Sequence, residues 1–211
     1  FKNSQCPVVI GPNRIQAAKH LMENTDSNVI LSDDGLQHFS LGRDIEILMI
    51  DGNRKFGNEL LLPAGPLREP KSRIKTVDFT ISSNRKWPSV ANYEMKYRPF
   101  KWVHMKSQKE YDIFDWPLKK EVNAVAGIGN PSNFFNLLKQ LGFDISEYAF
   151  PDHHDFHSVD FEIMDNQPTV MTEKDAIKCS FLDHTNYWYL KIEAEVSDNF
   201  EQDFLAEIKS K

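Results

Sequence analysis

Short apolar runs that stop abruptly at acidic residues constrain the fold of this chain most strongly. Val29–Ser32 is followed at once by Asp33 and Asp34, and the run Ile45–Ile50 is followed by Asp51. Continuous apolar runs of this length are typical of buried parallel strands. Because ligands of open α/β sheets bind beyond the carboxyl ends of the strands, we expect Asp33 and Asp34 to lie at a functional edge.

The rest of the sequence continues an alternation of strands and helices. A strand is expected at Cys6–Ile10, and Asn13 can cap a helix that runs to about Asn24. Asn130 before Pro131 marks the start of a later helix. Further strands are expected at Asp78–Ser82, Val122–Ala126, Ile145–Phe150, Thr169–Thr172 and Tyr187–Val196, and further helices at Glu173–Lys178 and Asn199–Ser210. This order predicts an α/β fold with a parallel sheet.

Composition supports a folded protein and limits its partners. Hydrophobic residues make up 40% of the 211 positions, which is enough for a substantial core. The net charge of -6 argues against nucleic-acid binding, which depends on clustered Lys and Arg. Cys6 and Cys179 indicate neither a disulfide framework nor a zinc site, so a reducing, cytoplasmic setting fits best. No apolar run is long enough to span a bilayer. The first residue is Phe1 and not methionine, so we expect that part of the natural protein precedes it.

One segment carries a local excess of positive charge. Tyr93–Met105 partly alternates polar and apolar residues, which suits an exposed strand or a ribbon that links two domains. Between Arg85 and Lys109 there are seven basic residues and one acid, Glu94. A solvated face is the simplest explanation, and a surface for anionic lipid headgroups is the alternative.

The acid pair is suited to magnesium chemistry. Asp33 and Asp34 could hold Mg²⁺ directly or through water, because this ion prefers hard oxygen ligands. A helix cap or a turn is the ordinary alternative, although Gln37 and His38 close by strengthen the case for a site. Arg68-Glu69 could contact phosphate and metal-bound water, or the two side chains could simply pair with each other.

The second half of the sequence also places polar side chains after an expected strand. His153 and His154 lie between Asp152 and Asp155. A neighbouring carboxylate can orient an imidazole and raise its pKa, so one of the two histidines could act as a general acid or base. A solvated turn is the alternative.

Two further segments precede expected helices. Gly127–Ser132 could cradle a phosphate on backbone N–H groups, although plain connections have the same composition. Thr172–Asp175 is typical of a helix start with favourable acids in its first turn, which leaves Lys174 unexplained. The motifs G-x-x-x-x-G-K-[ST], G-x-S-x-G and H-E-x-x-H do not occur in the sequence, so the phosphate cradle expected opposite the acids is missing.

Seven stretches spread in order over most of the chain are more specific together than any single motif. They are SDDGLQH (32–38), RDIEI (43–47), DGNRKFGN (51–58), LPAGPLRE (62–69), AGIGNP (126–131), FPDH (150–153) and MTEKD (171–175). In these stretches the chain resembles the tetraacyldisaccharide 4'-kinases of lipid A biosynthesis.

This resemblance implies a P-loop kinase that uses ATP and Mg²⁺ to phosphorylate the 4'-hydroxyl of a lipid disaccharide 1-phosphate, forming lipid IVA. It implies an α/β fold in which a partial P-loop-kinase-like sheet (1–87) and a second, smaller α/β domain (118–211) are joined by a two-stranded ribbon (88–117). The last residues could return to the ribbon or the larger domain. The implied location is the cytoplasmic face of the bacterial inner membrane, as a peripheral protein with no nucleic-acid partner.

The resemblance also implies roles for individual residues. The implied metal ligands are Asp33, Asp34 and Glu69, the catalytic residues are Asp34, Arg68 and His153, and the nucleotide-binding residues are Gln37, His38 and Lys174. The family's P-loop, a membrane-docking helix and the aspartate that works with His153 lie before the region represented here. We therefore expect truncation just upstream of Phe1 and an inactive fragment. Two alternatives stay open: a metal-dependent phosphohydrolase with Asp33, Asp34, His38 and His153 as ligands, and a non-catalytic nucleotide- or lipid-binding module.

Overall fold

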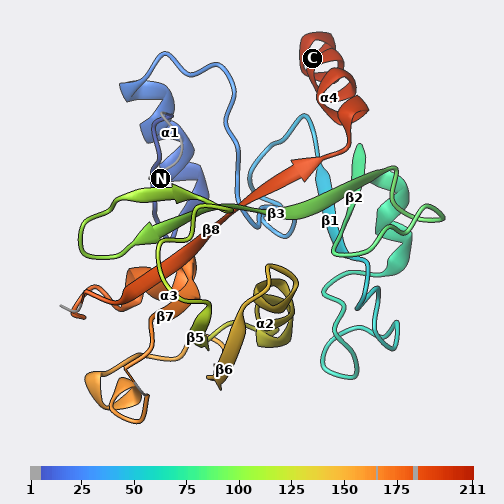
Figure 1. Ribbon diagram of the computed structural model, residues 1–211. Helices are drawn as coiled ribbons and strands as arrows, with labels where there is room; N and C mark the ends of the chain where they lie inside the picture. The colour runs from blue at the N-terminus through green and yellow to red at the C-terminus, as the bar shows by residue number, and fades with distance from the viewer. Residues whose placement is uncertain (1–5, 165, 183–184) are drawn as a thin grey trace. The chain divides into compact units, whose positions relative to one another are not determined.

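Most of the expected apolar segments form strands, and the expected helices form as well (Figure 1). The computed structural model describes residues 6–164, 166–182 and 185–211. In chain order the helices are α1 (Arg14–Asn24), α2 (Pro131–Gln140), α3 (Glu173–Lys178) and α4 (Asp198–Ser210), with short 3-10 helices η1 (Lys71–Thr76) and η2 (Ser158–Phe161). The strands are β1 (Ile47–Asp51), β2 (Phe79–Ser83), β3 (Tyr93–His104), β4 (Glu110–Asp112), β5 (Glu121–Ala126), β6 (Asp144–Ala149), β7 (Thr169–Thr172) and β8 (Tyr187–Val196). The predicted α/β class is confirmed.

The chain divides into two units. The first comprises the chain up to Met95 together with Val196–Lys211, and the second comprises Lys96–Glu195. One division falls within β3 and the other near the end of β8, so the expected linker 88–117 is shared between the units. Helix α4 belongs to the first unit although it ends the chain.

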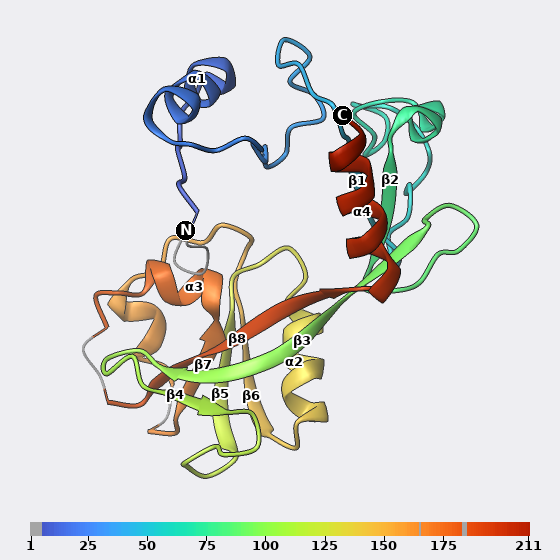
Figure 2. The same ribbon diagram turned by 90° about the horizontal axis from the view of Figure 1, so that it is seen from above.

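The first unit is built on two parallel strands that are covered by the last helix. Strand β1 pairs with β2 in parallel, with Ile47 opposite Phe79, and all five residues of β2 are buried. The ring of Phe79 lies 5.6 Å from that of Phe200 and 5.9 Å from that of Phe204, both on α4. Figure 2 shows α4 beside β2, the strand that carries Phe79. Aromatic pairs at such distances contribute beyond the area that they bury. Helix α4 is therefore anchored on the first unit.

The second unit contains a parallel sheet with a core on both faces. Strand β5 lies between β6 and β7, β7 pairs with β8, and all three pairings are parallel. Five of the six β5 residues are buried, which explains the continuous apolar run. On one face Phe134, Phe135 and Leu138 of α2 pack into a core that includes Trp102 and Trp188. The other core includes Val125, Phe156, Phe161, Met171, Ala176 and Cys179.

Two of the expected strands do not form. Neither Cys6–Ile10 nor Val29–Ser32 adopts strand structure or pairs with a described strand. Leu31 is 80% exposed and Ile10 is 91% exposed, so neither run lies in a core. A strand needs hydrogen bonds to a neighbouring strand, and an apolar run alone does not supply that neighbour. Both predictions were therefore wrong, and Asp33 and Asp34 do not follow a strand.

Among the residues that the structure describes, no helix is both long enough and apolar enough to cross a membrane.

Candidate functional site

The acid pair lies in a loop of successive turns. Asp33 and Asp34 form the first turn, and Asp34 has a left-handed backbone with φ of 48°. Aspartate tolerates this conformation better than most residues do. The carbonyl of Gly35 accepts hydrogen bonds from the His38 amide at 3.0 Å and from the Arg43 guanidinium at 2.9 Å. These bonds fix the loop while both Asp side chains stay exposed.

Arg68 brings the second expected site segment to the acid loop. Its Nη1 donates to Asp34 Oδ1 at 3.3 Å and to Oδ2 at 3.2 Å, and to Gln37 Oε1 at 3.2 Å. The Arg68 and Asp34 side chains are 59% and 71% exposed, so this ion pair contributes about 0–1 kcal/mol to stability. Its importance is geometric, because it joins two segments that the sequence separates. A direct Arg68–Glu69 pair was the other possibility, and no ion pair links these two side chains in the described chain.

The Gln37 side chain connects Arg68 to Glu69. Its amide nitrogen donates to Glu69 Oε1 at 2.7 Å, while its oxygen accepts from Arg68. The other Glu69 oxygen, Oε2, accepts from Arg73 Nε at 3.1 Å. Both oxygens of the expected metal ligand Glu69 are therefore occupied by hydrogen bonds in this structure.

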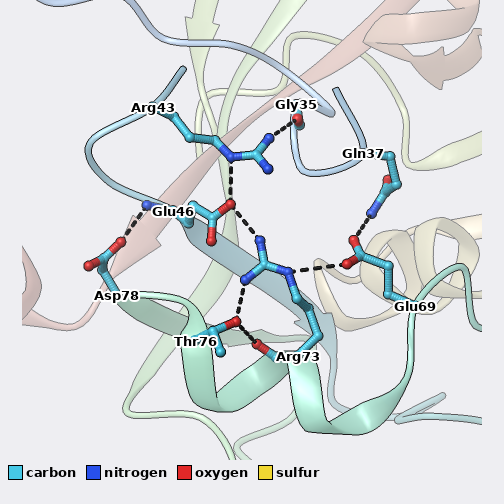
Figure 3. Close-up of polar contacts among 8 residues, drawn as sticks. All are labelled: Gly35, Gln37, Arg43, Glu46, Glu69, Arg73, Thr76 and Asp78. Atoms are coloured by element: carbon cyan, nitrogen blue, oxygen red, sulfur yellow. Dashed lines mark hydrogen bonds and ion pairs between the residues drawn. The ribbon is translucent and has the colours of Figure 1, made fainter. Parts of the chain in front are cut away.

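Arg73 and Glu46 extend this network to the start of β1, as Figure 3 shows. Arg73 Nη2 lies 2.5 Å from Glu46 Oε1, and Arg43 Nε lies 2.6 Å from the same oxygen. The hydrogen bond to Glu46 is the largest of the causes that raise the pKa of the Arg73 guanidinium, so this group stays charged. The sequence patterns above predict no role for Arg43, Glu46 or Arg73. The signals that could have found them were the family-like stretch RDIEI and the spacing of four residues between Glu69 and Arg73.

The loop between β1 and η1 holds Arg68 and Glu69 in place. Asn58 Nδ2 donates to the Ala64 carbonyl at 2.8 Å, and the Leu62 amide donates to the Leu67 carbonyl at 2.9 Å. The Leu62-Pro63 peptide bond is cis. Next to this loop is a cavity of about 140 Å³, lined mainly by apolar side chains together with Gln37, Arg68, Glu69, Lys71 and Arg73.

The second unit carries the remaining predicted residues. Lys174 Nζ lies 3.0 Å from Asp152 Oδ1, which also accepts the His153 amide at 3.0 Å. His153 has a left-handed backbone with φ of 63°, and its side chain is 77% exposed. The hydrogen bond from Lys174 is the first cause of the lowered pKa of the Asp152 carboxyl, followed among the lowering causes by the charges of His153 and Lys174 and the His153 amide. Helix capping did not explain Lys174. In the structure its ammonium group binds the Asp152 carboxylate, which also accepts the backbone amide of His153.

Asp175 ties together the ends of β5 and β7. Its buried carboxylate accepts the Gly127 amide at 2.9 Å and the Thr172 hydroxyl at 2.6 Å. Thr172 caps α3 as predicted, because its hydroxyl oxygen accepts the Asp175 amide. A Cβ on Gly129 would lie 3.4 Å from Asp152 Oδ2. Two carboxylates thus flank the Gly127–Ser132 loop, which is unfavourable for an anion.

The His154 side chain packs against an aromatic ring and a carboxylate of its own unit. Its ring stacks on Phe150 with centroids 4.7 Å apart, and its Nε2 lies 3.0 Å from Asp160 Oδ2. Its side chain is half-buried. Of the two neighbouring histidines, His153 is the more exposed.

The predicted site residues therefore fall into two groups, one in each unit. Asp34, Gln37, Arg68 and Glu69 are linked by hydrogen bonds in the first unit, and His38 lies in the same loop. Asp33 accepts from Arg14 through its backbone carbonyl at 3.5 Å. Within residues 6–164, 166–182 and 185–211, no group of three or more His, Cys, Asp or Glu side chains is arranged to hold a metal.

An α/β chain that gathers an arginine, an amide and exposed carboxylates has the side chains that phosphoryl-transfer sites use. The chain belongs to the tetraacyldisaccharide-1-P 4'-kinase family, whose model matches residues 1–209.

Relatives and a solved structure agree with this membership. The tetraacyldisaccharide 4'-kinase of Nitrosococcus oceani is 45% identical over 203 residues, which are 94% of this chain and 58% of that protein. The enzyme of the same name from Legionella pneumophila strain Corby is 46% identical, over 94% of this chain and 60% of the relative. The crystal structure of the "apo" form of LpxK from Aquifex aeolicus in complex with ATP has a TM-score of 0.73 and 26% identity, covering 93% of this chain and 62% of that one. The chain thus spans about 60% of the length of these relatives.

Proposed function

We propose that the whole protein carrying this chain is an ATP-dependent kinase that phosphorylates the 4'-hydroxyl of tetraacyldisaccharide 1-phosphate, forming lipid IVA in lipid A biosynthesis. The family match over residues 1–209 carries this proposal, because it follows the full chain and not one motif. The linked Asp34, Gln37, Arg68 and Glu69 support it, since phosphoryl transfer depends mainly on positioned charges and hydrogen bonds.

Asp33 and Asp34 are the residues that we propose for Mg²⁺. Their carboxylates supply hard oxygen ligands and are exposed, so the donor chemistry fits the ion. Glu69 differs because its side chain is only 19% exposed and its two oxygens accept hydrogen bonds from Gln37 and Arg73, so we assign it to metal-bound water. When bound, Mg²⁺ would neutralise charge on the phosphates of ATP.

The other side chains receive positioning and proton-transfer roles. We assign Arg68 to the transferred phosphate, because a guanidinium matches the geometry of phosphate oxygens. Gln37 and His38 would line the nucleotide site, to which the family resemblance also assigns Lys174. His153 would take the proton of the 4'-hydroxyl as the new oxygen–phosphorus bond forms. Its partner aspartate would come from residues outside this sequence.

The domain organisation and location belong to the same proposal. We infer a kinase core domain, a ribbon and a smaller domain, at about residues 1–87, 88–117 and 118–211. The packing of Phe200 and Phe204 on Phe79 favours placing the last helix with the core domain. A lipid substrate favours a peripheral protein at the cytoplasmic face of the bacterial inner membrane.

The test is a lipid kinase assay with the protein encoded by the complete gene, with ATP, Mg²⁺ and the lipid disaccharide in mixed micelles. We expect phosphate transfer to the 4'-hydroxyl, and Arg68→Ala should lower kcat/KM about 100-fold, because it removes a donor to the transferring phosphate. Lys19→Ala, which removes an exposed basic side chain of α1 in the same unit, should leave kcat/KM unchanged.

Failure of the unsubstituted protein to transfer phosphate would overturn the proposal. The 211 residues alone, which contain no G-x-x-x-x-G-K-[ST], should be inactive in the same assay. Transfer by this polypeptide alone would show that no further phosphate cradle is needed.

A further inference from the structure

We propose that Arg73 is a positioning residue that holds Glu69 in the orientation in which Glu69 fixes the Gln37 amide and, through it, Arg68. The catalytic meaning of this inference rests on the proposed function, whereas the geometry can be tested without activity.

The Arg73 guanidinium is held on three sides (Figure 3). Its Nε donates to Glu69 at 3.1 Å, its Nη2 to Glu46 at 2.5 Å and its Nη1 to the Thr76 hydroxyl at 2.5 Å. The Arg73, Glu69 and Glu46 side chains are only 22%, 19% and 12% exposed. Water therefore screens these pairs less than it screens the Arg68–Asp34 pair.

Glu46 anchors Arg73 to the beginning of the parallel strands. The Glu46 amide donates to Asp78 Oδ2 at 2.8 Å, and its carbonyl accepts from the amides of Asp78 and Phe79 at 3.1 Å each. Arg43 approaches the same Glu46 oxygen as Arg73 does. Arg73 thus connects a carboxylate fixed beside the sheet to Glu69, which lies in a loop.

The position of Glu69 decides how the Gln37 amide is turned. A carboxylate accepts hydrogen bonds and cannot donate them, so it must face the Gln37 nitrogen. The Gln37 oxygen then faces Arg68, which can only donate. Reversing the amide would set oxygen against carboxylate and N–H₂ against guanidinium. Arg73 therefore acts on Arg68 through two intervening side chains.

Shape is as necessary to this role as charge. A lysine at position 73 would keep the positive charge, but one flexible ammonium cannot reproduce a planar fork that meets three acceptors. If charge alone mattered, Arg73→Lys would behave like the unsubstituted protein.

The experiment uses the ¹⁵N-labelled full-length protein and two measurements. The first is the side-chain amide resonance of Gln37, assigned by its loss in Gln37→Ala. The second is the Mg²⁺ concentration that gives half the maximal kinase rate. We expect Arg73→Lys to shift the Gln37 resonance and to raise the half-saturating Mg²⁺ about tenfold, as changes to the partners of metal-site residues do. Lys75→Arg, the reverse exchange on the exposed side of η1, should change neither.

An unshifted Gln37 resonance in folded Arg73→Lys would overturn the inference. A fall in folded protein lowers the maximal rate but does not move the half-saturating Mg²⁺, so a purely structural role is distinguishable. If Arg73→Lys does not fold, as shown by the lack of a cooperative thermal transition, Glu46→Gln is tested by the same two measurements. This variant keeps Arg73 and removes the negative charge of Glu46 that Arg73 binds. If the unsubstituted protein lacks kinase activity, the proposed function fails while the Gln37 resonance still tests Arg73.

Discussion

At the scale of single residues, the Lys174–Asp152 pair makes a prediction about pH. Lys174→Met should raise the pKa of the Asp152 carboxyl toward its ordinary value, because the hydrogen bond from Lys174 is the largest cause of its lowering. A carboxyl with a lowered pKa in the folded state stabilises that state above its ordinary pKa and loses this effect as the pH falls through the lowered value. The stability difference between the variant and the unsubstituted protein should therefore be present at neutral pH and vanish in strong acid. A ¹³C carboxyl titration followed by NMR measures the pKa.

Lys178→Met is the matched control for this pH prediction. Lys178 lies on the same helix but donates to the His154 carbonyl at 3.1 Å, so its removal should leave the Asp152 titration in place. An Asp152 pKa that is identical in Lys174→Met and the unsubstituted protein would refute the assigned cause.

At this scale the sequence predicts part of the site. Motif and residue chemistry single out Asp34, Gln37, Arg68 and Glu69, and hydrogen bonds link these four side chains in the structure. Arg73 was missed because its partners depend on how two loops fold, and an arginine four residues after a glutamate is ordinary on protein surfaces. The catalytic, nucleotide and metal roles of these residues stay predictions.

At the scale of elements, the close approach of β1 and β2 at their carboxyl ends predicts a sharp effect at Gly52. The Gly52 amide donates to the Ser83 carbonyl at 2.8 Å, and a Cβ on Gly52 would lie 1.8 Å from the Arg85 carbonyl oxygen. Gly52→Ala should lower the free energy of unfolding by about 3 kcal/mol, because the backbone must shift to admit the methyl group. Urea denaturation followed by circular dichroism measures this change.

Gly42→Ala provides the comparison. A Cβ at Gly42 would meet no heavy atom within 4 Å, so the free energy of unfolding should change by less than about 0.5 kcal/mol. Equal effects of the two substitutions would contradict the packing at the end of β1.

Strands were predicted correctly where the strand that pairs with them could also be recognised in the sequence. The apolar runs that became β1, β5 and β7 each pair with another expected strand. Val29–Ser32 has the same character but pairs with none of the described strands, so apolarity alone gave a wrong prediction. Whether a run becomes a strand depends on a partner that its own sequence does not specify.

At the scale of the whole molecule, the alternation of strands and helices predicted the α/β class, but not where α4 packs. The contacts of Phe200 and Phe204 with Phe79 join residues more than 100 positions apart. The apolar residues of α4 are spaced as in any amphipathic helix. This spacing does not specify which part of the protein the helix packs against, so its place in the first unit could not be predicted. The second unit, in contrast, is continuous in sequence.

That continuity predicts that residues 93–196 fold without the rest of the chain. This segment contains all of β3 and β8, and its core residues Trp102, Val122 and Leu138 have side chains with 0% exposure. We expect a cooperative urea transition with a native near-ultraviolet signal from the buried tryptophans. Leu138→Ala in the same polypeptide should lower the free energy of unfolding by about 3 kcal/mol, because it opens a cavity under α2. A gradual transition that Leu138→Ala does not move would mean that this core needs the first unit to form.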